Sequence, residues 1–442
     1  MLSPRNRELL GLLPAALLVT AGFAAIFIQA ERTTPGASTN VTLNHASNAS
    51  LTYGAAFLAL CVVGHLVIRY ALPDADPYLF PLGAVLASVG IVMVYRINPT
   101  LARQQAQWMV VGLALFAATI LLLRRRGVAV LERYRYTIAA VGIGITILPR
   151  LPGIGGEING AYLDVHVGSV SFQPAELAKI AVVIFLASYL RDNRQILVTA
   201  GRRVLGVTLP PMKQFGPMLV VWGAALGTLL LTRELGTSLM FYGAFLALLY
   251  VATGRLSFPL IGLLLFALGA WFLAVHVSHV HARVLAWQHP FDPALYELKV
   301  GGSYQLAQSL FAQADGGLLG TGFDQSLLKL LPIPESDMIY AVIANELGLA
   351  GAAALLATYL LFVARGLKVA MLARDSFSKL LAVGLSFTVA MQVFVIVGGV
   401  TRVIPLTGVT LPFVAYGGSS VAMNFVLLAL LLVISDRARR PA

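Results

Sequence analysis

Residues 338–364 read MIYAVIANELGLAGAAALLATYLLFVA, an apolar run in which Glu346 is the one charged side chain. About 20 such residues form a helix long enough to cross the hydrocarbon core of a bilayer. Asp337 stands directly in front of the run. The stretch therefore predicts a membrane-spanning helix with one acidic group at its entrance and a second within its length, where charge is costly and usually functional.

Apolar runs of this kind recur along the chain, and we count about twelve of them. They lie at 9–29, 51–71, 78–97, 106–123, 135–150, 175–190, 216–232, 236–253, 256–276, 338–364, 380–400 and 419–435. The 442 residues are 58% apolar and 11% charged, whereas a soluble domain carries roughly 25% charge. This composition excludes a water-soluble enzyme and predicts an all-α polytopic integral membrane protein with about 12 transmembrane helices.

The basic residues predict the orientation, because Lys and Arg accumulate on the cytoplasmic side of membrane proteins. With the N-terminus inside, roughly two thirds of the 31 Lys and Arg fall in cytoplasmic segments, Arg124-Arg125-Arg126 being the strongest anchor. An even number of spans then places both termini in the cytoplasm. The net charge of +12 is therefore interpreted as topology rather than as a nucleic-acid surface.

This topology divides the chain into two parts. Residues 1–105 form an N-terminal group of transmembrane helices with a flexible polar outer loop over 30–50, and residues 106–442 form the remaining core with a long extracytoplasmic loop over 277–337. Loops of that length are usually functional or disordered. Four motifs of interest all lie at the outer ends of predicted spans, which argues against a cytosolic substrate.

The first motif is Gln173-Pro174-Ala175-Glu176, followed by Lys179. Proline suits the first turn of a helix, so a helix is predicted to begin here. The i, i+3 spacing allows Glu176 and Lys179 to pair. A salt bridge that only pins the helix entrance and a role in function both stay open.

The second motif, Arg233-Glu234-Leu235-Gly236, joins two apolar runs by a tight turn and fits either a capped helical hairpin or polar groups that face a cavity. The fourth motif, residues 405–420, contains too much Pro and Gly for a straight spanning helix. Such backbone lies at membrane depth only when it is buried in protein or lines a wet cavity. We expect it to line the outer cavity, with a plain re-entrant turn as the alternative.

The third motif is the loop 277–337 itself. His276, His279 and His281 near its start share no single helical face, so a histidine metal site is not predicted. Asp337 ends the loop and is either the N-cap of the next helix or, with Ser336 as the cap, a free carboxylate for chemistry.

In this order, the motifs resemble the SEDS family (shape, elongation, division and sporulation) of bacterial membrane proteins, the RodA and FtsW type. The resemblance covers about Pro152 to Asp436 and leans towards RodA. The residues that carry it are Gln173-Pro174-Ala175-Glu176 with Lys179, Glu234-Leu235-Gly236-Thr237-Ser238, Tyr304-Gln305, Gln308-Ser309, Gly320-Thr321-Gly322, Ser336-Asp337, Glu346-Leu347-Gly348 with Gly351, and Leu411-Pro412-Phe413 with Tyr416-Gly417-Gly418-Ser419-Ser420.

The resemblance implies an inverting peptidoglycan glycosyltransferase that polymerises lipid II, the undecaprenyl-diphosphate-linked disaccharide-pentapeptide, at the outer face of the cytoplasmic membrane. It implies a class B penicillin-binding protein and other elongasome or divisome proteins as partners, and no nucleic acid. It also implies a core of ten spans, to which this chain adds two at the N-terminus.

The resemblance places the essential acid of the family on Asp337. The substrate-binding residues are predicted to be Glu176, Lys179, Arg233, Glu234, Arg283, Gln305, Gln308, Ser309, Glu346, Tyr416 and Ser419. The chain departs from the family pattern at Tyr162-Leu163-Asp164, Glu234, Asn345 and Ala415. The contacts made at these positions are therefore not predicted.

The expected chemistry has Asp337 as general base for the attacking sugar hydroxyl and a cation to stabilise the diphosphate leaving group. Arg283, Lys179, Arg233 or a bound Mg²⁺ or Mn²⁺ are candidates for that cation, and no metal ligand is assigned. Two alternatives stay open, a lipid II flippase or transporter and a non-catalytic scaffold for a penicillin-binding protein. The choice between elongation, division and sporulation is not predicted.

Overall fold

The computed structural model describes residues 3–32, 39–155, 162, 164–167, 170–199, 202–204, 207–209, 212–231, 234–298, 301–323 and 330–440. These residues are mostly helical, which confirms the predicted all-α class. The helices are α1 (Pro4–Gly11), α2 (Leu13–Arg32), α3 (Thr39–Ala71), α4 (Leu79–Ile97), α5 (Pro99–Arg126), α6 (Ala129–Arg133), α7 (Arg135–Ile145), α8 (Pro174–Thr199), α9 (Met212–Leu231), α10 (Leu235–Thr253), α11 (Ser257–His276), α12 (Ser278–Gln288), α13 (Pro293–Tyr296), α14 (Tyr304–Gly316), α15 (Ile339–Leu372), α16 (Ser376–Val400) and α17 (Gly418–Arg439).

A short 3₁₀ helix, η1 (Leu148–Arg150), and two small hairpins complete the described secondary structure. Strands β1 (Val165–Val167) and β2 (Val170–Phe172) are antiparallel, with Val165 opposite Phe172. Strands β3 (Arg202–Val204) and β4 (Val207–Leu209) are also antiparallel, with Arg202 opposite Leu209.

Within the described residues, nine helices are long and apolar enough to cross a membrane. They are Pro4–Gln29, Asn48–Ala71, Leu79–Ile97, Pro99–Arg126, Leu235–Thr253, Ser257–His276, Ile339–Leu372, Ser376–Val400 and Gly418–Arg439, and each matches a predicted run. The other three predicted runs fall on α7, α8 and α9. Helix α7 has only 11 residues, and the apolar run of α8 contains charged side chains. The count of about twelve spans stays a prediction.

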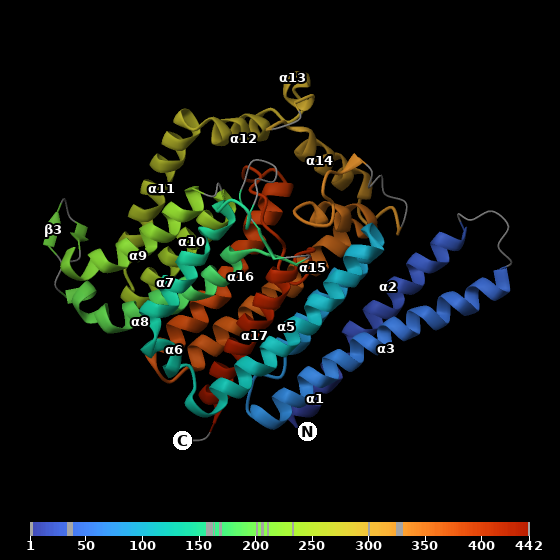
Figure 1. Ribbon diagram of the computed structural model, residues 1–442, viewed down its shortest axis with the longest axis horizontal. Coiled ribbons are helices and arrows are strands. Elements are labelled where there is room, and N and C mark those ends of the chain that lie inside the picture. The colour runs from blue at the N-terminus through green and yellow to red at the C-terminus, as the bar shows by residue number, and fades with distance from the viewer. Residues whose placement is uncertain are drawn as a thin grey trace.

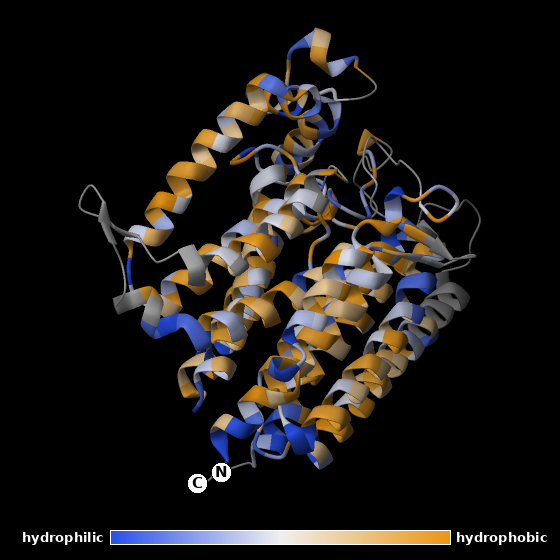
Figure 2. Cartoon of the chain, turned by 60° about the vertical axis from the view of Figure 1, so that its left-hand side comes forward, coloured by the Kyte–Doolittle hydropathy of each residue, from blue (hydrophilic) through white to orange (hydrophobic). Residues whose placement is uncertain are grey.

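The long helices form a bundle, and α17 lies at its centre (Figure 1). Helix α17 packs chiefly on α5, while α15 packs on α16 and α7 on α8. Helices α11, α12 and α13 form an arch over one end of the bundle (Figure 1), and α11 is exposed over most of its length. Figure 2 shows hydrophobic residues along the middle of the helices and hydrophilic residues gathered at their ends, as a membrane protein requires.

The long outer segment 277–337 is ordered over its described part. It contains α12, α13 and α14 rather than an irregular loop. The polar loop predicted over 30–50 is wrong for residues 39–50, which belong to the first turns of α3. Their Asn, Ser and Thr content indicates a polar segment in contact with water. A helix that extends beyond the apolar core of the membrane can have the same composition as a loop.

The loop before α4 meets the ends of α15 and α17 at the end of the bundle opposite to the arch. The side chain of Asp76, just before α4, is fully buried there and forms ion pairs with Arg365 at 2.6 Å and with Arg439. The backbone N–H of Tyr78 donates to Asp76 Oδ1 at 2.9 Å, and that of Asp74 donates to Asp436 Oδ1 at 2.9 Å. The loop before α4 is thus fixed to α15 and α17, and the ends of the chain lie on the same side (Figure 1).

We predict that Asp76→Asn lowers the free energy of unfolding by about 3–5 kcal/mol, because it leaves two arginines beside a neutral buried group. Asp74→Asn is the matched control, since the structure gives the Asp74 side chain no ion pair within the described residues. Thermal unfolding of the purified variants in detergent is the measurement. Equal stability of the two variants would show that the Asp76 ion pairs contribute nothing.

Candidate active site

Hydrogen bonds bring the sequence motifs together at the arch end of the bundle. The backbone N–H of Gln173 donates to Ser419 Oγ at 3.0 Å, and its side-chain Nε2 donates to Glu234 Oε1 at 3.2 Å. The backbone N–H of Tyr416 donates to the carbonyl of Glu335 at 2.8 Å. Segments from four distant parts of the chain therefore meet at one place, as the sequence predicts.

Lys179 is the buried centre of this meeting point. Helix α8 begins at Pro174 as predicted, and Lys179 Nζ lies 2.5 Å from Glu176 Oε2. The same ammonium group donates to Gln392 Oε1 of α16 at 3.0 Å and to Asn424 Oδ1 of α17 at 3.4 Å. The predicted salt bridge is confirmed, and it belongs to a network that joins three helices.

The same network holds the irregular segment between α16 and α17. Residues 401–417 contain no helix, as predicted. The Nε2 group of Gln392 donates to the carbonyl of Thr410 at 2.8 Å, and the hydroxyls of Thr410 and Ser420 lie 3.1 Å apart. Asn424 Nδ2 donates to Ser420 Oγ at 3.3 Å. The two amides thus accept hydrogen bonds from Lys179 through their oxygens and donate through their nitrogens, Gln392 to this segment and Asn424 to Ser420 at the start of α17.

Glu234 lies at the entrance of α10 and is buried. Burial raises the pKa of Glu234 to about 8, with the nearby Glu176 and Asp164 adding to the rise and the hydrogen bond from Gln173 opposing it. Its carboxyl is therefore mostly protonated at neutral pH. Gly236, two residues after Glu234, packs closely on Thr407 and Val409. A Cβ atom at this position would lie 2.1 Å from Val409 Cγ2, so no larger residue fits without displacing that side chain.

Asp337 is held beneath the arch by α14 and α12. The side-chain amide of Gln305 donates to both carboxylate oxygens, at 3.2 and 3.3 Å. Arg283 interacts electrostatically with the same carboxylate, and its guanidinium also donates to the carbonyl of Leu406 at 3.2 Å. Burial raises the pKa of Asp337 to about 6, although Gln305 and Arg283 both favour the ionised form. Asp337 is thus a carboxylate poised to exchange a proton near neutral pH.

The alternative of Asp337 or Ser336 as a helix cap is wrong. Helix α15 begins at Ile339, and Met338 occupies the N-cap position without a side-chain cap. The reason is that Asp337 stands one residue too early, where its carboxylate faces Gln305 instead of the first turn. Its oxygens remain available for chemistry rather than for the helix.

Helix α14 places Gln305 by docking onto the end of α16. Ser309 Oγ and Gln313 Nε2 both donate to the carbonyl of Val400, at 3.1 and 3.0 Å. Gln308 Nε2 donates to the hydroxyl of Tyr296 at 2.6 Å. Ser309 is fully buried, so the structure gives Ser309 a positioning contact and Gln308 a contact within the arch.

Glu346 finds its partner in α4. Its Oε1 atom lies 3.1 Å from a guanidinium nitrogen of Arg96, and its side chain is buried. Two residues on, Gly348 breaks the helical backbone of α15 with φ 67° and ψ −171°. Arg96 thus holds the first, site-bearing part of α15 just before the break.

The glycine-rich segment 316–322 forms hydrogen bonds with the backbone groups on both sides of this break. The N–H groups of Thr321 and Gly322 donate to the carbonyls of Asn345 and Glu346 at 2.9 and 3.1 Å. On the other side of the break, the N–H groups of Leu349 and Ala350 donate to the carbonyls of Gly317 and Leu318, at 2.9 and 3.1 Å. Gly320 is required, because its φ is +85° and a Cβ would lie 2.1 Å from the Glu346 carbonyl oxygen.

Tyr416 and its neighbours are tied to the start of α5. The hydroxyl of Tyr416 lies 2.5 Å from Gln104 Oε1. Gln105 Nε2 donates to the carbonyl of Ala415 at 3.1 Å, and Gln105 Oε1 accepts from the Gly417 N–H at 3.3 Å. Ala415, where the family pattern differs, therefore contributes its backbone rather than a side chain.

The other departures also have local contacts. Asn345 Nδ2 donates to the carbonyl of Ala312 at 2.6 Å, and the Arg150 guanidinium lies 5.3 Å from the centre of the Tyr162 ring. Arg233 and Leu163 lie outside the described residues. In the described chain, no group of three or more His, Cys, Asp or Glu is arranged to hold a metal ion.

Sequence reasoning missed Arg96, Gln392 and Asn424. The signal was present, since each is a polar or charged residue within a long apolar run, and such residues are rare in spans without a function. What they contact depends on how helices distant in sequence pack, which no local pattern reveals.

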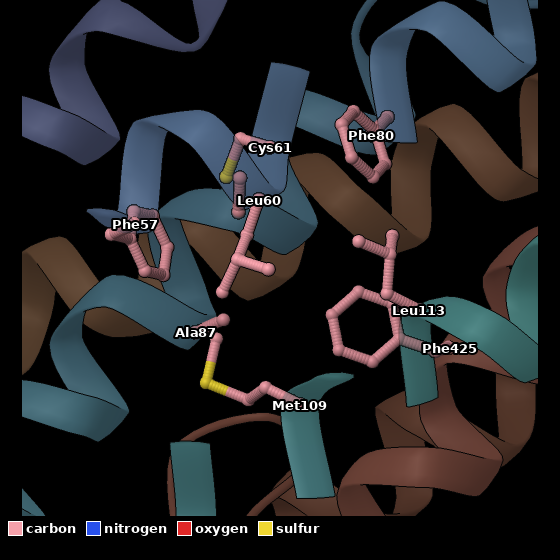
Figure 3. A pocket seen from close by; sticks show the side chains of 9 residues that line it. Phe57, Leu60, Cys61, Phe80, Ala87, Met109, Leu113 and Phe425 are labelled. Atoms are coloured by element: carbon pink, nitrogen blue, oxygen red, sulfur yellow. The ribbon is translucent and has the colours of Figure 1, made fainter. Parts of the chain in front are cut away.

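An apolar cavity lies away from these polar groups. It is lined by Phe57, Leu60, Cys61, Phe80, Ala84, Ala87, Met109, Leu113 and Phe425, from α3, α4, α5 and α17 (Figure 3). Its lining offers no acid, base or cation. The cavity therefore does not contribute to the candidate active site.

Comparisons with known proteins agree with this geometry. The family model FTSW_RODA_SPOVE, described as cell cycle protein, matches residues 78–440. The chain is 40% identical over 450 residues to a peptidoglycan glycosyltransferase RodA of Mycobacterium tuberculosis strain H37Rv, covering 99% of this chain and 92% of that protein.

Two solved structures are similar to this chain at 25% identity. One is from a study of structural coordination of polymerization and crosslinking by a peptidoglycan synthase complex, with a TM-score of 0.67 over 83% of this chain and 99% of that chain. The other is the rod shape determining protein RodA of Thermus thermophilus, with a TM-score of 0.58 over 83% of this chain and 98% of that one.

We predict that Lys179→Met destabilises the protein by about 3–5 kcal/mol, because Glu176 is left as an uncompensated buried charge. The double variant Glu176→Gln/Lys179→Met should lose less, since it buries no unpaired charge. Thermal unfolding in detergent compares the two. A double variant as unstable as the single one would show that the amide contacts, and not the ion pair, carry the stability.

Proposed function

The chain belongs to the FtsW, RodA and SpoVE family and is a peptidoglycan glycosyltransferase of the RodA type, and on this basis we propose that it polymerises lipid II at the outer face of the cytoplasmic membrane. The proposed partner is a class B penicillin-binding protein that crosslinks the product. The similar chain from a peptidoglycan synthase complex supports this partnership.

The single observation that carries the proposal is the placement of Asp337. A carboxylate lies directly before a membrane-spanning helix, is oriented by Gln305, and has its pKa raised to about 6. A general base is most effective when its pKa lies near the working pH. Asp337 accepts the proton of the attacking sugar hydroxyl as this oxygen bonds to the anomeric carbon and the bond from that carbon to the diphosphate oxygen breaks. Direct displacement inverts that centre.

The leaving diphosphate needs positive charge nearby. Arg283 is the proposed source of this charge. Its guanidinium is close enough to interact electrostatically with Asp337, and it is held in place by a hydrogen bond to the Leu406 carbonyl. Lys179 is a poorer candidate than the sequence suggests, since its ammonium group already serves Glu176, Gln392 and Asn424. Its proposed role is to position the segment beside the substrate.

The remaining predicted substrate-binding residues divide by their contacts. Gln305 acts by orienting Asp337, while Glu346 and Ser309 act through the backbone that they hold. Glu234, Gln308, Tyr416 and Ser419 supply polar groups around the meeting point of the motifs. A bound Mg²⁺ or Mn²⁺ ion stays part of the proposal, because Mg²⁺ is held by one or two carboxylates together with the phosphates of its substrate.

The proposed membrane arrangement extends the nine helices that qualify as spans. Helices α7, α8 and α9 pack within the same bundle and complete about twelve spans, ten of the family core and two at the N-terminus. Both termini then lie in the cytoplasm, and the arch with Asp337 lies outside. The accessibility of cysteines introduced at each end to a membrane-impermeant reagent tests this orientation.

We predict that Asp337→Asn lowers the rate of glycan polymerisation at least about 100-fold, because the amide cannot accept the proton. The measurement uses the full chain with its partner, labelled lipid II and detection of polymer. Asp315→Asn is the matched control, an exposed acid on α14 that should keep full activity.

Near-normal polymerisation by Asp337→Asn would refute the assignment of the base. If the unmodified protein makes no polymer and instead moves labelled lipid II across vesicles, the flippase alternative holds. If it does neither, the scaffold alternative holds.

The activity of the unmodified protein should depend on pH with an acidic limb near 6. The base must be ionised, so the active fraction falls to about one tenth at pH 5. Arg283→Gln removes a charge that lowers the pKa of Asp337, so it should move this limb to higher pH. Initial rates of polymerisation between pH 5 and 8 measure both effects, and an unchanged limb in Arg283→Gln would contradict the coupling.

A further inference from the structure

A basic pocket lies at the end of the bundle opposite to Asp337, where α15, α16 and α17 reach the membrane boundary. It is an open hollow with a volume of about 450 Å³, and it is lined by Ala373, Arg374, Asp375, Ser378, Ile434, Arg437, Ala438 and Arg440. Asp337 precedes the first turn of α15 and Arg374 follows its last, so the 34 residues of α15 separate the two places, and those after the break at Gly348 alone span roughly 35 Å. The pocket is therefore not part of the candidate active site.

Two of its three arginines have no acidic partner. Arg374 donates to the carbonyl of Arg440, and Arg437 donates to the carbonyl of Arg125 at 2.9 Å. Within the described residues, neither forms an ion pair with a carboxylate. Their charges are fixed in place by backbone carbonyls and are not neutralised by them.

The acidic groups of the pocket are already engaged. Asp436 accepts from Arg440 Nε at 2.8 Å and forms an ion pair with it at 2.6 Å. Asp375 caps α16 by accepting from the Ser378 N–H at 2.8 Å. With Asp436 beside the pocket counted, three arginines meet two carboxylates, so a surplus of one positive charge remains. Arg374 and Arg437 are the two arginines without a carboxylate partner among the described residues, and this surplus suits an anion.

The surroundings indicate which anion. Met371 and Leu372, in the last turn of α15 next to Arg374, are 75% and 43% exposed. An apolar, lipid-facing surface thus leads directly to the arginines. Guanidinium groups match the geometry of phosphate oxygens, and basic pockets between spans on the cytoplasmic side bind anionic headgroups.

We propose that this pocket binds the phosphate headgroup of an anionic phospholipid, whose acyl chains lie along the exposed end of α15. From the sequence, these arginines only predict which side of the membrane they lie on. In the structure, they line one pocket. The lipid connects the ends of α15, α16 and α17 to the membrane and is separate from the polymerisation reaction.

The test measures lipid binding and not activity. The full chain in detergent is mixed with phosphatidylglycerol or phosphatidylcholine, and native mass spectrometry counts the lipids retained. Retention of phosphatidylglycerol should exceed that of phosphatidylcholine. Arg374→Gln/Arg437→Gln should reduce phosphatidylglycerol retention about 25-fold, at roughly fivefold for each arginine near a headgroup.

The matched control is Arg133→Gln/Arg194→Gln, which removes the same charge from exposed positions on α6 and α8, outside the pocket, and should lose clearly less retention. Ala438→Glu is a second variant, which adds an acid to the pocket with every arginine in place and should also lose binding. A melting temperature measured without lipid confirms that each variant is folded.

Equal losses in the arginine pair and its control would overturn the proposal, because binding would then depend on general charge. Full retention in Ala438→Glu would overturn it as well. Displacement of phosphatidylglycerol by millimolar inorganic phosphate would show that a soluble phosphate is the ligand and would overturn the lipid assignment. If only an acidic peptide displaces phosphatidylglycerol, the ligand is a protein partner and the lipid assignment is also overturned.

Discussion

A lysine ammonium group buried between helices needs partners for its charge and its N–H bonds, and Lys179 has an ion pair with Glu176 and hydrogen bonds to Gln392 and Asn424. An unpaired charge at this depth would cost several kcal/mol, so α8, α16 and α17 must keep this arrangement. Gln392 in turn donates to Thr410 in the segment before α17, and Asn424 donates to Ser420, whose hydroxyl contacts Thr410. The irregular backbone has no regular hydrogen-bond pattern of its own, and this network around Lys179 is one of the contacts that position it.

Much of this arrangement was readable locally. Pro174 marks a helix start, the i, i+3 spacing pairs Glu176 with Lys179, and the Pro and Gly content of 405–417 excludes a helix, because each of these signals acts within a few residues. The partner of Glu346 and the two amide partners of Lys179 were not readable, since they come from helices far away in sequence. The helical turns of residues 39–50 were missed because polarity predicts contact with water and not backbone shape.

The break in α15 shows how an interrupted helix is tolerated in a membrane protein. Backbone groups freed at Gly348 cannot turn to lipid, and no water is available in the hydrocarbon core. The segment 316–322 supplies the missing donors and acceptors. Because the same break lies close to the Arg96 and Glu346 ion pair, the short stretch that follows Asp337 is fixed at both ends and is independent of the long remainder of the helix.

The contacts of Asp76 have a consequence for the biogenesis of the protein. Its loop is synthesised early, but Arg365 and Arg439 lie near the end of the chain, and so does Asp436, which holds the neighbouring backbone. At translation speeds of about 5–20 residues per second, the loop waits roughly 20–70 s for them. During that time the first spans are inserted with an unneutralised carboxylate at their edge. Closure of the bundle is therefore a late event, and truncation of the last few residues should leave a protein that is inserted but not assembled.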